Sequence, residues 1–407
     1  MRIENLRSEI KDGRARVLGT VIWENCGRAQ EELYFETDEA FVGDLTCNAD
    51  AFLLARAIPA MHYGEERVFV DGEVCPELKK GLITSMSFIS HWFLKDRRLP
   101  AIQTKLKSIL PGRQRPERAG FFFSGGVDSF ATLRANRLNY PPEHPLYFKD
   151  GIIAYGLEMT STEAFGHVLA TVSKAAAAVG VTLIPVYTNI YLPFWEEDEH
   201  KHFSFWEDEF MGAALASLAH VFANRLSDVS ISATFSITIP VPFGTHPLLD
   251  PNFSSTDLRI RHEEFLHTRL SKTKMLADWQ PALHYMRVCN KFRSYKDGVV
   301  NCCDCEKCVR TMLELMVSGS LEKADAFDKK EISEELLMKH AKIKGRYTEL
   351  SYKELMAPLS GIGRHDLVGV IKKKLTDYKR ENWIAKLRDF DGEHLNGSLV
   401  RMKRLIS

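Results

Sequence analysis

The sequence lacks long hydrophobic runs and carries no net charge. Its 407 residues contain 54 Lys and Arg against 54 Asp and Glu. No stretch approaches the roughly 20 apolar residues that a membrane span requires. The N-terminus alternates charges and has no apolar segment typical of a signal peptide, so we expect a soluble, cytoplasmic protein. Balanced charge gives no global basic field, which leaves nucleic-acid binding open only through a local patch.

Cysteines are scarce over most of the chain. Three of the eight, Cys26, Cys47 and Cys75, are scattered, whereas the other five lie within 20 residues, from Cys289 to Cys308. Disulfide frameworks are typical of small secreted domains, and no signal peptide is expected here. The bunched cysteines therefore indicate a metal site.

Composition and periodicity divide the chain into three predicted parts. Residues 1–115 contain segments rich in β-branched and aromatic residues and two segments with helical spacing, which predict an N-terminal α+β accessory domain. Residues 111–120, PGRQRPERAG, contain two prolines and two glycines and predict a linker. Residues 116–320 predict an α/β domain, and residues 321–407 predict a C-terminal helical region.

Short apolar strands alternate with helices after residue 119. The strand-like segments read GFFF, GIIAYGLE, VTLIPVYTN and SDVSISAT. This alternation predicts βαβ units and a Rossmann-like, doubly wound parallel sheet with helices on both faces. Residues 238–258 predict a long loop rich in Pro, Gly, Ser and Asp, and such loops in compact domains are typically functional or disordered.

The segment SGGVDS, residues 124–129, separates the first of these strands from its helix. Its glycines permit backbone conformations that are closed to other residues, and its successive amides, together with the helix dipole, suit an anion. Its serines add hydroxyl groups, and Asp128 suits a Mg²⁺ ion or the orientation of the loop. The residues predict a phosphate-binding loop, with a plain glycine turn and helix cap as the simpler alternative. No GxxxxGK[ST] pattern is present, which excludes a Walker loop.

The hexapeptide S-G-G-x-D-S between a strand and a helix resembles the signature of the PP-loop ATP pyrophosphatases. The resemblance implies an adenine nucleotide α-hydrolase-like fold and a reaction in which a substrate oxygen attacks the α-phosphorus of ATP, with Mg²⁺ present and pyrophosphate leaving. A second nucleophile then displaces AMP. The phosphates would lie on Ser124, Gly125, Gly126, Val127, Asp128 and Ser129. The resemblance also implies that adenine lies at the end of the second strand, near Tyr155, Gly156 and Leu157.

Four cysteines have the spacing of a zinc site. Cys302, Cys305 and Cys308 lie three apart, and Cys289 lies thirteen residues upstream of Cys302. Three thiolates on a tight loop and one from a distant segment suit a tetrahedral Zn²⁺ without an open position, which is typical of a structural site. Cys303 is an alternative to Cys302 as the ligand. Free structural thiols and an iron–sulfur cluster are the alternatives to zinc.

The cysteine pattern is similar to that of the 7-cyano-7-deazaguanine synthases, PP-loop enzymes with an upstream Cys and then C-G-x-C-x-x-C. Cys303 stands where that family has glycine. The resemblance covers about residues 116–320 and implies an enzyme that activates a deazaguanine carboxylate with ATP and converts it, using ammonia, through an amide to a nitrile. Residues 1–115 and 321–407 have no counterpart in the family. Relatives with such extensions look similar to proteins of bacterial anti-phage gene clusters, in which the partner can be a macromolecule.

Further polar residues follow the fourth predicted strand and should face the nucleotide. Arg269 and Lys272 are three apart and share one face of a predicted helix. They are candidates for holding ATP phosphates or a substrate carboxylate, with a solvated helix face as the alternative. Other polar groups in this region are His246, Asp250, Ser254, Ser255 and His262, and either histidine is a candidate acid or base.

Two charged segments have simpler explanations. The carboxylates of WEDEF, residues 206–210, suit the dipole of a helix start, and metal binding there is the less favoured reading. The lysines at 372–374 mark a solvated helix face, with contact to nucleic acid as the alternative.

Together these observations predict an ATP-dependent, Mg²⁺-requiring and zinc-stabilised ligase or synthase that adenylates a carboxylate. Asp128, Ser129, Arg269 and Lys272 are the predicted catalytic residues. We expect a small carboxylate or nucleobase-like substrate, while a protein partner at residues 1–115 and an oligomeric state stay open. The alternatives are an RNA base-modifying enzyme and, in another class, an ATP-binding, zinc-stabilised interaction module without turnover.

Overall fold

The computed structural model describes residues 1–108, 117–159, 161–194, 204–291, 295–296 and 298–394. The chain divides into two compact units. The first comprises Met1–Arg287 and Phe292–Val300, and the second comprises Val288–Lys291 and Asn301–Ser407. No helix in the described part of the chain is both long and apolar enough to cross a membrane.

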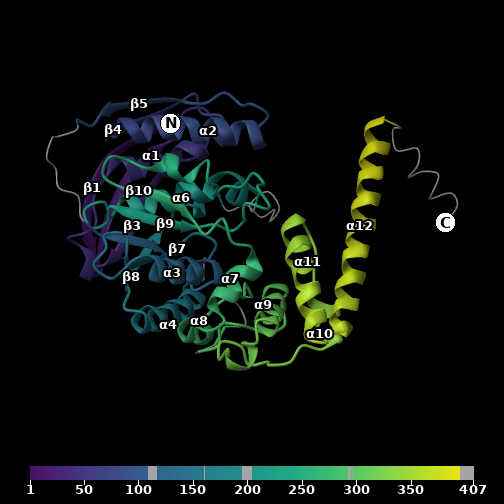
Figure 1. Cartoon of the computed structure of the whole chain (residues 1–407). Helices are drawn as coiled ribbons and strands as arrows, with labels where there is room; N and C mark the ends of the chain where they lie inside the picture. Colours follow the sequence, from purple (N-terminus) through teal and green to yellow (C-terminus); the bar gives the residue numbers. More distant parts are fainter. Residues whose placement is uncertain (109–116, 160, 195–203, 292–294, 297, 395–407) are drawn as a thin grey trace. The chain divides into compact units, whose positions relative to one another are not determined.

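Ten strands form one sheet in the first unit, in the order β10-β9-β6-β7-β8-β3-β2-β1-β4-β5 (Figure 1). The strands are β1 (Arg2–Lys11), β2 (Arg14–Ile22), β3 (Glu31–Asp38), β4 (Arg67–Val74), β5 (Ala101–Leu106), β6 (Ala119–Phe122), β7 (Phe148–Tyr155), β8 (Thr182–Thr188), β9 (Asp228–Ser232) and β10 (Arg259–Glu263). Pairing is parallel from β10 to β8 and among β1, β4 and β5, and antiparallel from β8 through β3 and β2 to β1. The predicted α/β class and mostly parallel sheet are confirmed, and helices flank the sheet in a manner compatible with a Rossmann-like fold.

Helices connect the strands of the first unit and cover the sheet. They are α1 (Ala49–His62), α2 (Pro76–Phe93), α3 (Val127–Asn139), α4 (Thr162–Ala178), α6 (Met211–His220), α7 (Arg269–Leu276) and α8 (Gln280–Tyr285). Shorter turns are η1 (Glu39–Phe41), η2 (Leu192–Phe194), the π-helical η3 (Phe205–Phe210) and η4 (Asp250–Phe253).

Strand β6 lies at the centre of the parallel strands, and buried aromatic side chains pack along it. Phe121 and Phe123 are fully buried. The ring of Phe121 stacks on Phe148 at 4.9 Å, and Phe123 meets Phe130 of α3 edge-on at 5.1 Å. Counted from β6, the five parallel strands lie in the order 3-2-1-4-5, so the direction of winding reverses between β6 and β9. Ligands of open α/β sheets bind at the carboxyl ends of strands at such a switch point.

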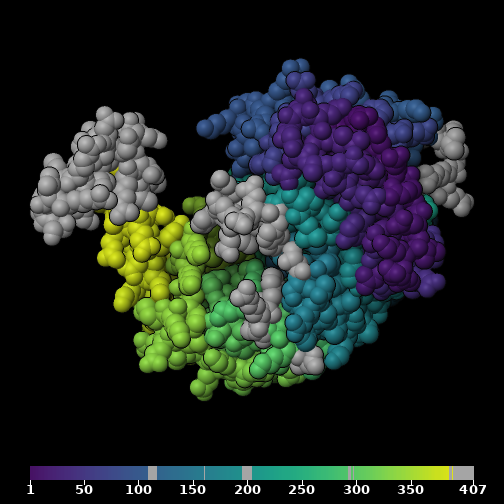
Figure 2. All heavy atoms as spheres, turned by 180° about the vertical axis from the view of Figure 1, so that it is seen from behind, coloured from purple at the N-terminus to yellow at the C-terminus, as the bar shows by residue number. Residues whose placement is uncertain are grey.

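The N-terminal strands belong to the same sheet and the same core as the α/β part, which differs from the separate domain predicted for residues 1–115. Phe35 of β3 pairs with Thr188 of β8, and one hydrophobic cluster runs from Met1 to Ile260. Figure 2 shows the purple and blue N-terminal residues directly against the teal residues that follow. Without β3, strand β8 would present an unpaired edge. The predicted linker at 111–120 falls mainly on 111–116, which lie outside the described residues.

The second unit is helical, but it begins earlier than residue 321. Its elements are α9 (Glu306–Val317), η6 (Leu321–Lys323), α10 (Glu334–His340), α11 (Arg346–Gly361) and α12 (His365–His394). Leu355 and Leu359 of α11 and Leu367 of α12 are fully buried. The cysteine-bearing segments 288–291 and 301–308 belong to this unit, so the predicted boundary at 320 is displaced toward residues 287–301. The four cysteines therefore belong to the helical second unit and not to the α/β unit.

Candidate functional site

The loop after β6 turns sharply before α3. Gly125 has φ +76°, a conformation that favours glycine. A Cβ at this position would lie 3.0 Å from Cγ2 of Val172. Gly126 then takes the N-cap position of α3 with an extended backbone. The two glycines of the motif therefore have different roles, one in the turn and one at the helix start.

The first turn of α3 has no side-chain cap at its N-cap residue. The amides of Val127, Asp128 and Ser129 have no acceptor within the helix, as at every helix start. The Ser129 hydroxyl donates to the Gly126 carbonyl at 3.0 Å, and the Gly126 amide donates to Ser124 Oγ at 3.3 Å. These bonds shape the loop without covering the helix amides, which leaves the arrangement that binds phosphate at helix N-termini. Because the N-cap is a glycine, no side chain caps this helix start.

Asp128 lies beside the two cations that the sequence predicted on one helix face. Arg269 Nη1 is 3.3 Å and Lys272 Nζ is 3.0 Å from the Asp128 carboxylate oxygens. Lys272 is 1% exposed and also donates to the Ala233 carbonyl at 2.5 Å. Thr268 caps α7 by accepting from the Ser271 amide, which fixes the first turn that carries Arg269. The alternative of a solvated helix face is wrong for these two residues.

The contact to Ala233 places Lys272 at the end of β9. Residue 233 directly follows β9, and residue 124 follows β6 after Phe123. The two strands are parallel neighbours, so their carboxyl ends meet at the edge where the winding reverses. Asp128, Arg269 and Lys272 therefore lie at the switch point of the sheet.

Arg287 is a third cation of the loop, and sequence reasoning missed it. Its amide donates to the Gly125 carbonyl at 2.8 Å, and its Nε donates to the Ser124 carbonyl at 3.3 Å. Its Nη1 donates to the Tyr295 hydroxyl at 3.0 Å. The carbonyls of Ser124 and Gly125 therefore both accept hydrogen bonds from Arg287. Nothing in the sequence marks Arg287 except its place two residues before Cys289.

Gly156 holds the ends of two strands close together. It follows β7, has φ +93°, and a Cβ there would lie 1.8 Å from the Thr188 carbonyl oxygen at the end of β8. Tyr155 packs its ring against Phe165 at 5.3 Å, while Leu157 is buried. The three residues predicted to contact adenine form the carboxyl end of β7, which is the neighbour of β6.

Four cysteines of the second unit converge on one point. One ligand atom from each of Cys289, Cys302, Cys305 and Cys308 lies within 4.8 Å of the others. The sulfurs of Cys302 and Cys308 are 4.0 Å apart, and those of Cys305 and Cys289 are 3.9 Å apart. Sulfurs of a tetrahedral zinc site with bonds of about 2.3 Å lie roughly 3.8 Å apart. The group can therefore hold a metal ion such as zinc.

Cys303 is not part of this group. Its backbone has φ +55°, and its sulfur contacts the Asn301 carbonyl at 3.9 Å. A positive φ is the conformation that glycine adopts most readily, so a glycine would suit this position. Of the two alternatives, Cys302 is the residue whose sulfur joins the group.

Backbone groups orient the cysteine sulfurs. The amide of Lys291 donates to Cys289 Sγ at 3.2 Å, and the amide of Cys308 donates to Cys305 Sγ at 3.5 Å. Hydrogen bonds from the Cys305 and Cys308 thiols hold the pKa of Cys289 far below its usual range. Asn301 Oδ1 accepts from the amide of Val288 at 2.9 Å. Such outer contacts fix the orientation of ligands in metal sites.

The remaining polar candidates lie in structural networks. His262 pairs with the fully buried Asp250 at 2.7 Å, and burial raises the pKa of Asp250 although His262 partly opposes it. Ser254 accepts from the Ile260 amide, and Ser255 accepts from two amides of a turn. His246 meets the ring of Trp92 at 5.1 Å. The hydrogen bonds of this network join the long loop to β10 and α2, and none of them reaches the Ser124–Ser129 loop in the part of the chain described.

Among the described residues, the carboxylates of residues 206–210 do not belong to a group of side chains that could hold a metal ion. Glu209 pairs with His62 at 2.9 Å. Burial, with the neighbouring Glu209, raises the pKa of Asp208 to about 6. These residues belong to the π-helical η3, which packs against α1 and α2.

Comparison of the chain with models of protein families, with curated proteins and with solved structures found no match.

Proposed function

We propose that the chain is an ATP-dependent adenylating enzyme of the PP-loop type, which converts ATP to AMP and pyrophosphate while activating a carboxylate. One observation supports this above the others: an uncapped, glycine-turned helix start lies at the switch point of a parallel sheet, beside Asp128, Arg269 and Lys272. Amides and cations together suit a polyphosphate group.

Each residue has a role in this proposal. The amides of Val127, Asp128 and Ser129 would bind the leaving pyrophosphate, whose charge increases as the bond to the α-phosphorus breaks. Arg269 and Lys272 would stabilise the same charge, and their fixed positions require no reorganisation during the reaction. A Mg²⁺ ion, when bound, would neutralise phosphate charge, and Asp128 is the residue that would hold it.

The end of β7 is the proposed place for adenine. Gly156 brings the end of β7 against the Thr188 carbonyl there, and Tyr155 presents an aromatic ring next to Phe165. The substrate carboxylate oxygen would attack the α-phosphorus, the bond to the β-phosphate oxygen would break, and an acyl adenylate and pyrophosphate would form. A nucleophile would then displace AMP from the acyl carbon.

The cysteine group is proposed as a structural zinc site. Four thiolates fill the coordination sphere of zinc and leave no position for a substrate. The metal would join segment 288–291 to the loop before α9, which is a fold-stabilising role within the second unit. This favours zinc over a reactive cluster as the function of the four cysteines.

The proposal is tested by following α-labelled ATP with Mg²⁺ and a panel of carboxylates, nucleobase-like acids included. We expect AMP and pyrophosphate in equal amounts, and a loss of at least about 100-fold in the Asp128→Asn variant, because charge positioning of this kind is worth 10²–10³ in rate. Asp278→Asn is the matched control, since the Asp278 side chain is 79% exposed and lies 3.7 Å from Arg134. Release of ADP in place of AMP would contradict the proposal. ATP binding without turnover for every acceptor would favour the non-catalytic module instead.

A further inference from the structure

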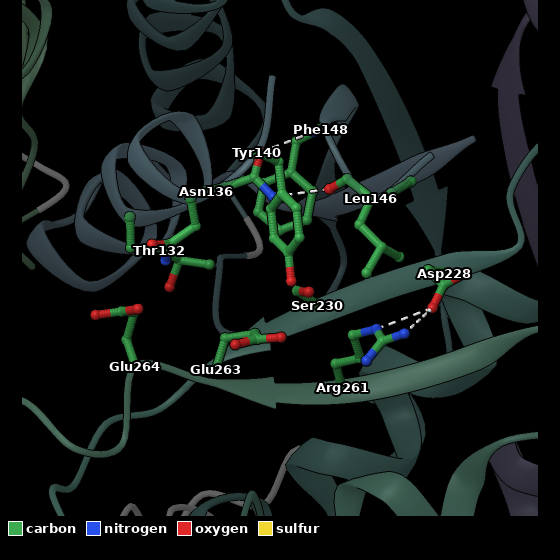
Figure 3. Close-up of a pocket in the computed structure, with 13 residues that line it drawn as sticks. Thr132, Asn136, Tyr140, Leu146, Phe148, Asp228, Ser230, Arg261, Glu263 and Glu264 are labelled. Atoms are coloured by element: carbon green, nitrogen blue, oxygen red, sulfur yellow. Dashed lines mark hydrogen bonds and ion pairs between the residues drawn. The ribbon is translucent and has the colours of Figure 1, made fainter. Parts of the chain in front are cut away.

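A cavity of about 60 Å³ lies between α3 and the β9–β10 edge of the sheet (Figure 3). Its polar lining includes Thr132 of α3, Ser230 of β9, Glu263 at the end of β10 and Glu264 directly after it. None of the residues of the Ser124–Ser129 loop lines it. A water needs about 10–15 Å³ of such volume, so the cavity has room for a small ion together with a few waters.

Two buried hydroxyls in this cavity have no hydrogen-bond partner in the described part of the chain. Thr132 is 2% exposed and Ser230 is 1% exposed, and neither Oγ atom has a partner among the described residues. Figure 3 shows both side chains on the side of the space that faces Glu263 and Glu264. A buried hydroxyl without a hydrogen-bond partner is destabilising, so the pair indicates that a polar occupant belongs between them.

The charge of the lining is negative. Arg261 neutralises Asp228 at 2.7 Å, and Glu264 lies 2.8 Å from Nδ1 of His267. Glu263 has no ion pair or side-chain hydrogen bond among the described residues, and it is half-buried. Burial raises the pKa of Glu263, and the adjacent Glu264 carboxylate adds to this effect against partial lowering by Arg261 and His262. A positive occupant would relieve the cost of this buried carboxylate.

We propose that the cavity binds a small monovalent cation, potassium or ammonium, through the Glu263 carboxylate and the hydroxyl oxygens of Thr132 and Ser230. Oxygen ligands suit hard cations, whereas Ca²⁺ takes six to eight oxygens and Mg²⁺ keeps several waters. The three side-chain oxygens are fewer than the six to eight that Ca²⁺ takes. One unpaired carboxylate with two neutral hydroxyls balances a single positive charge.

The cavity is connected to the proposed catalytic cations through the main chain. Thr132 lies one helical turn after Asp128 in α3. The Ala233 amide donates to the Glu263 carbonyl at 2.8 Å, and the Ala233 carbonyl accepts from Lys272. Occupancy would therefore fix both the helix that carries Asp128 and the carbonyl that positions Lys272. This consequence rests on the proposed function, and it predicts that the cation increases the rate of AMP formation.

Cation binding is tested without ATP, by thermal unfolding of the full chain in potassium, ammonium or choline chloride at one ionic strength. We expect potassium or ammonium to raise the midpoint saturably by about 2–4 °C relative to choline, because a ligand that binds only the folded state stabilises it. The response should disappear in Glu263→Gln and in Thr132→Val. Glu143→Gln, at an exposed position, is the charge-matched control and should keep the response.

A second measurement covers the case in which the variants unfold. Crystals soaked in a thallous salt should show an anomalous peak inside the cavity, since Tl⁺ replaces potassium and ammonium. Whichever of the two native cations acts at the lower concentration is the ligand. Equal midpoints in all three chlorides, or a cavity without the thallium peak, would overturn the cation site. Neither measurement depends on ATP turnover, so failure of the cation site and failure of the proposed enzyme are distinguishable.

Discussion

At the scale of the residue, Lys272 is the most informative side chain of the candidate site. A buried ammonium is costly unless it is paired and hydrogen-bonded, and Lys272 meets both conditions through Asp128 and the Ala233 carbonyl. Its position is fixed by the end of a strand, so it cannot follow a ligand as a flexible surface lysine can. Such a pre-positioned charge is what stabilisation of a developing phosphate charge requires.

Gly156 offers a prediction at the same scale. Gly156→Ala should destabilise the first unit by about 1–3 kcal/mol or more, because it combines a strained backbone with a Cβ that would overlap the Thr188 carbonyl. Chemical denaturation measures this change. Gly166→Ala is the matched control: Gly166 lies inside α4 with open space around it, and alanine there should stabilise by about 0.5–1 kcal/mol. Equal stability of the two variants would show that β7 and β8 do not approach as described.

Several residues of the candidate site could be predicted from the sequence, and others could not. The glycine turn, Asp128 and the cation pair on α7 were predictable because each depends on local spacing. Arg287 was not, because its contacts to Ser124 and Gly125 join residues more than 160 positions apart. The polar cavity was equally hidden, since Thr132 and Glu263 face one another only after β10 pairs with β9.

At the scale of the element, β10 shows why a strand can escape prediction. Only Ile260 of its five residues is buried, since the strand lies at the edge of the sheet. The sequence RIRHE therefore has no apolar alternation. The sequence predicted the preceding loop and the following helix, but it did not predict the strand between them. Central strands such as β6 and β7 were predictable because both of their faces are apolar.

The loop before α9 makes a testable prediction for the metal site. Cys302→Ser should reduce bound metal from about one ion per chain to near zero, because three thiolates do not complete the site. Cys303→Gly should keep the metal and leave the unfolding midpoint unchanged or higher, since glycine suits φ +55°. Elemental analysis of the purified variants measures their metal content and identifies the metal as zinc or iron. Thermal unfolding measures the midpoint. Metal loss in Cys303→Gly with retention in Cys302→Ser would reverse the ligand assignment.

At the scale of the molecule, the three predicted parts do not match the two compact units. The prediction for residues 1–115 relied on a change of composition near the predicted linker, but composition does not report strand pairing between distant segments. Strand β3 completes the edge of β8, and α1 packs on α6. A sequence pattern reveals each of these elements and not the partner against which it is buried.

This arrangement predicts that the N-terminal residues are required for folding of the first unit. A chain of residues 116–407 should lose cooperative unfolding and expose apolar surface, because β8 becomes an unpaired edge and α6 loses the buried face of α1. Coexpression of residues 1–115 as a separate chain should restore a single cooperative transition, since β3 pairs with β8 without needing a covalent link. Calorimetry and binding of a hydrophobic dye measure the two outcomes. A cooperative transition for residues 116–407 alone would instead mean that the first 115 residues are an independent accessory domain. The shared sheet argues against this, because ten strands with one continuous core should unfold together.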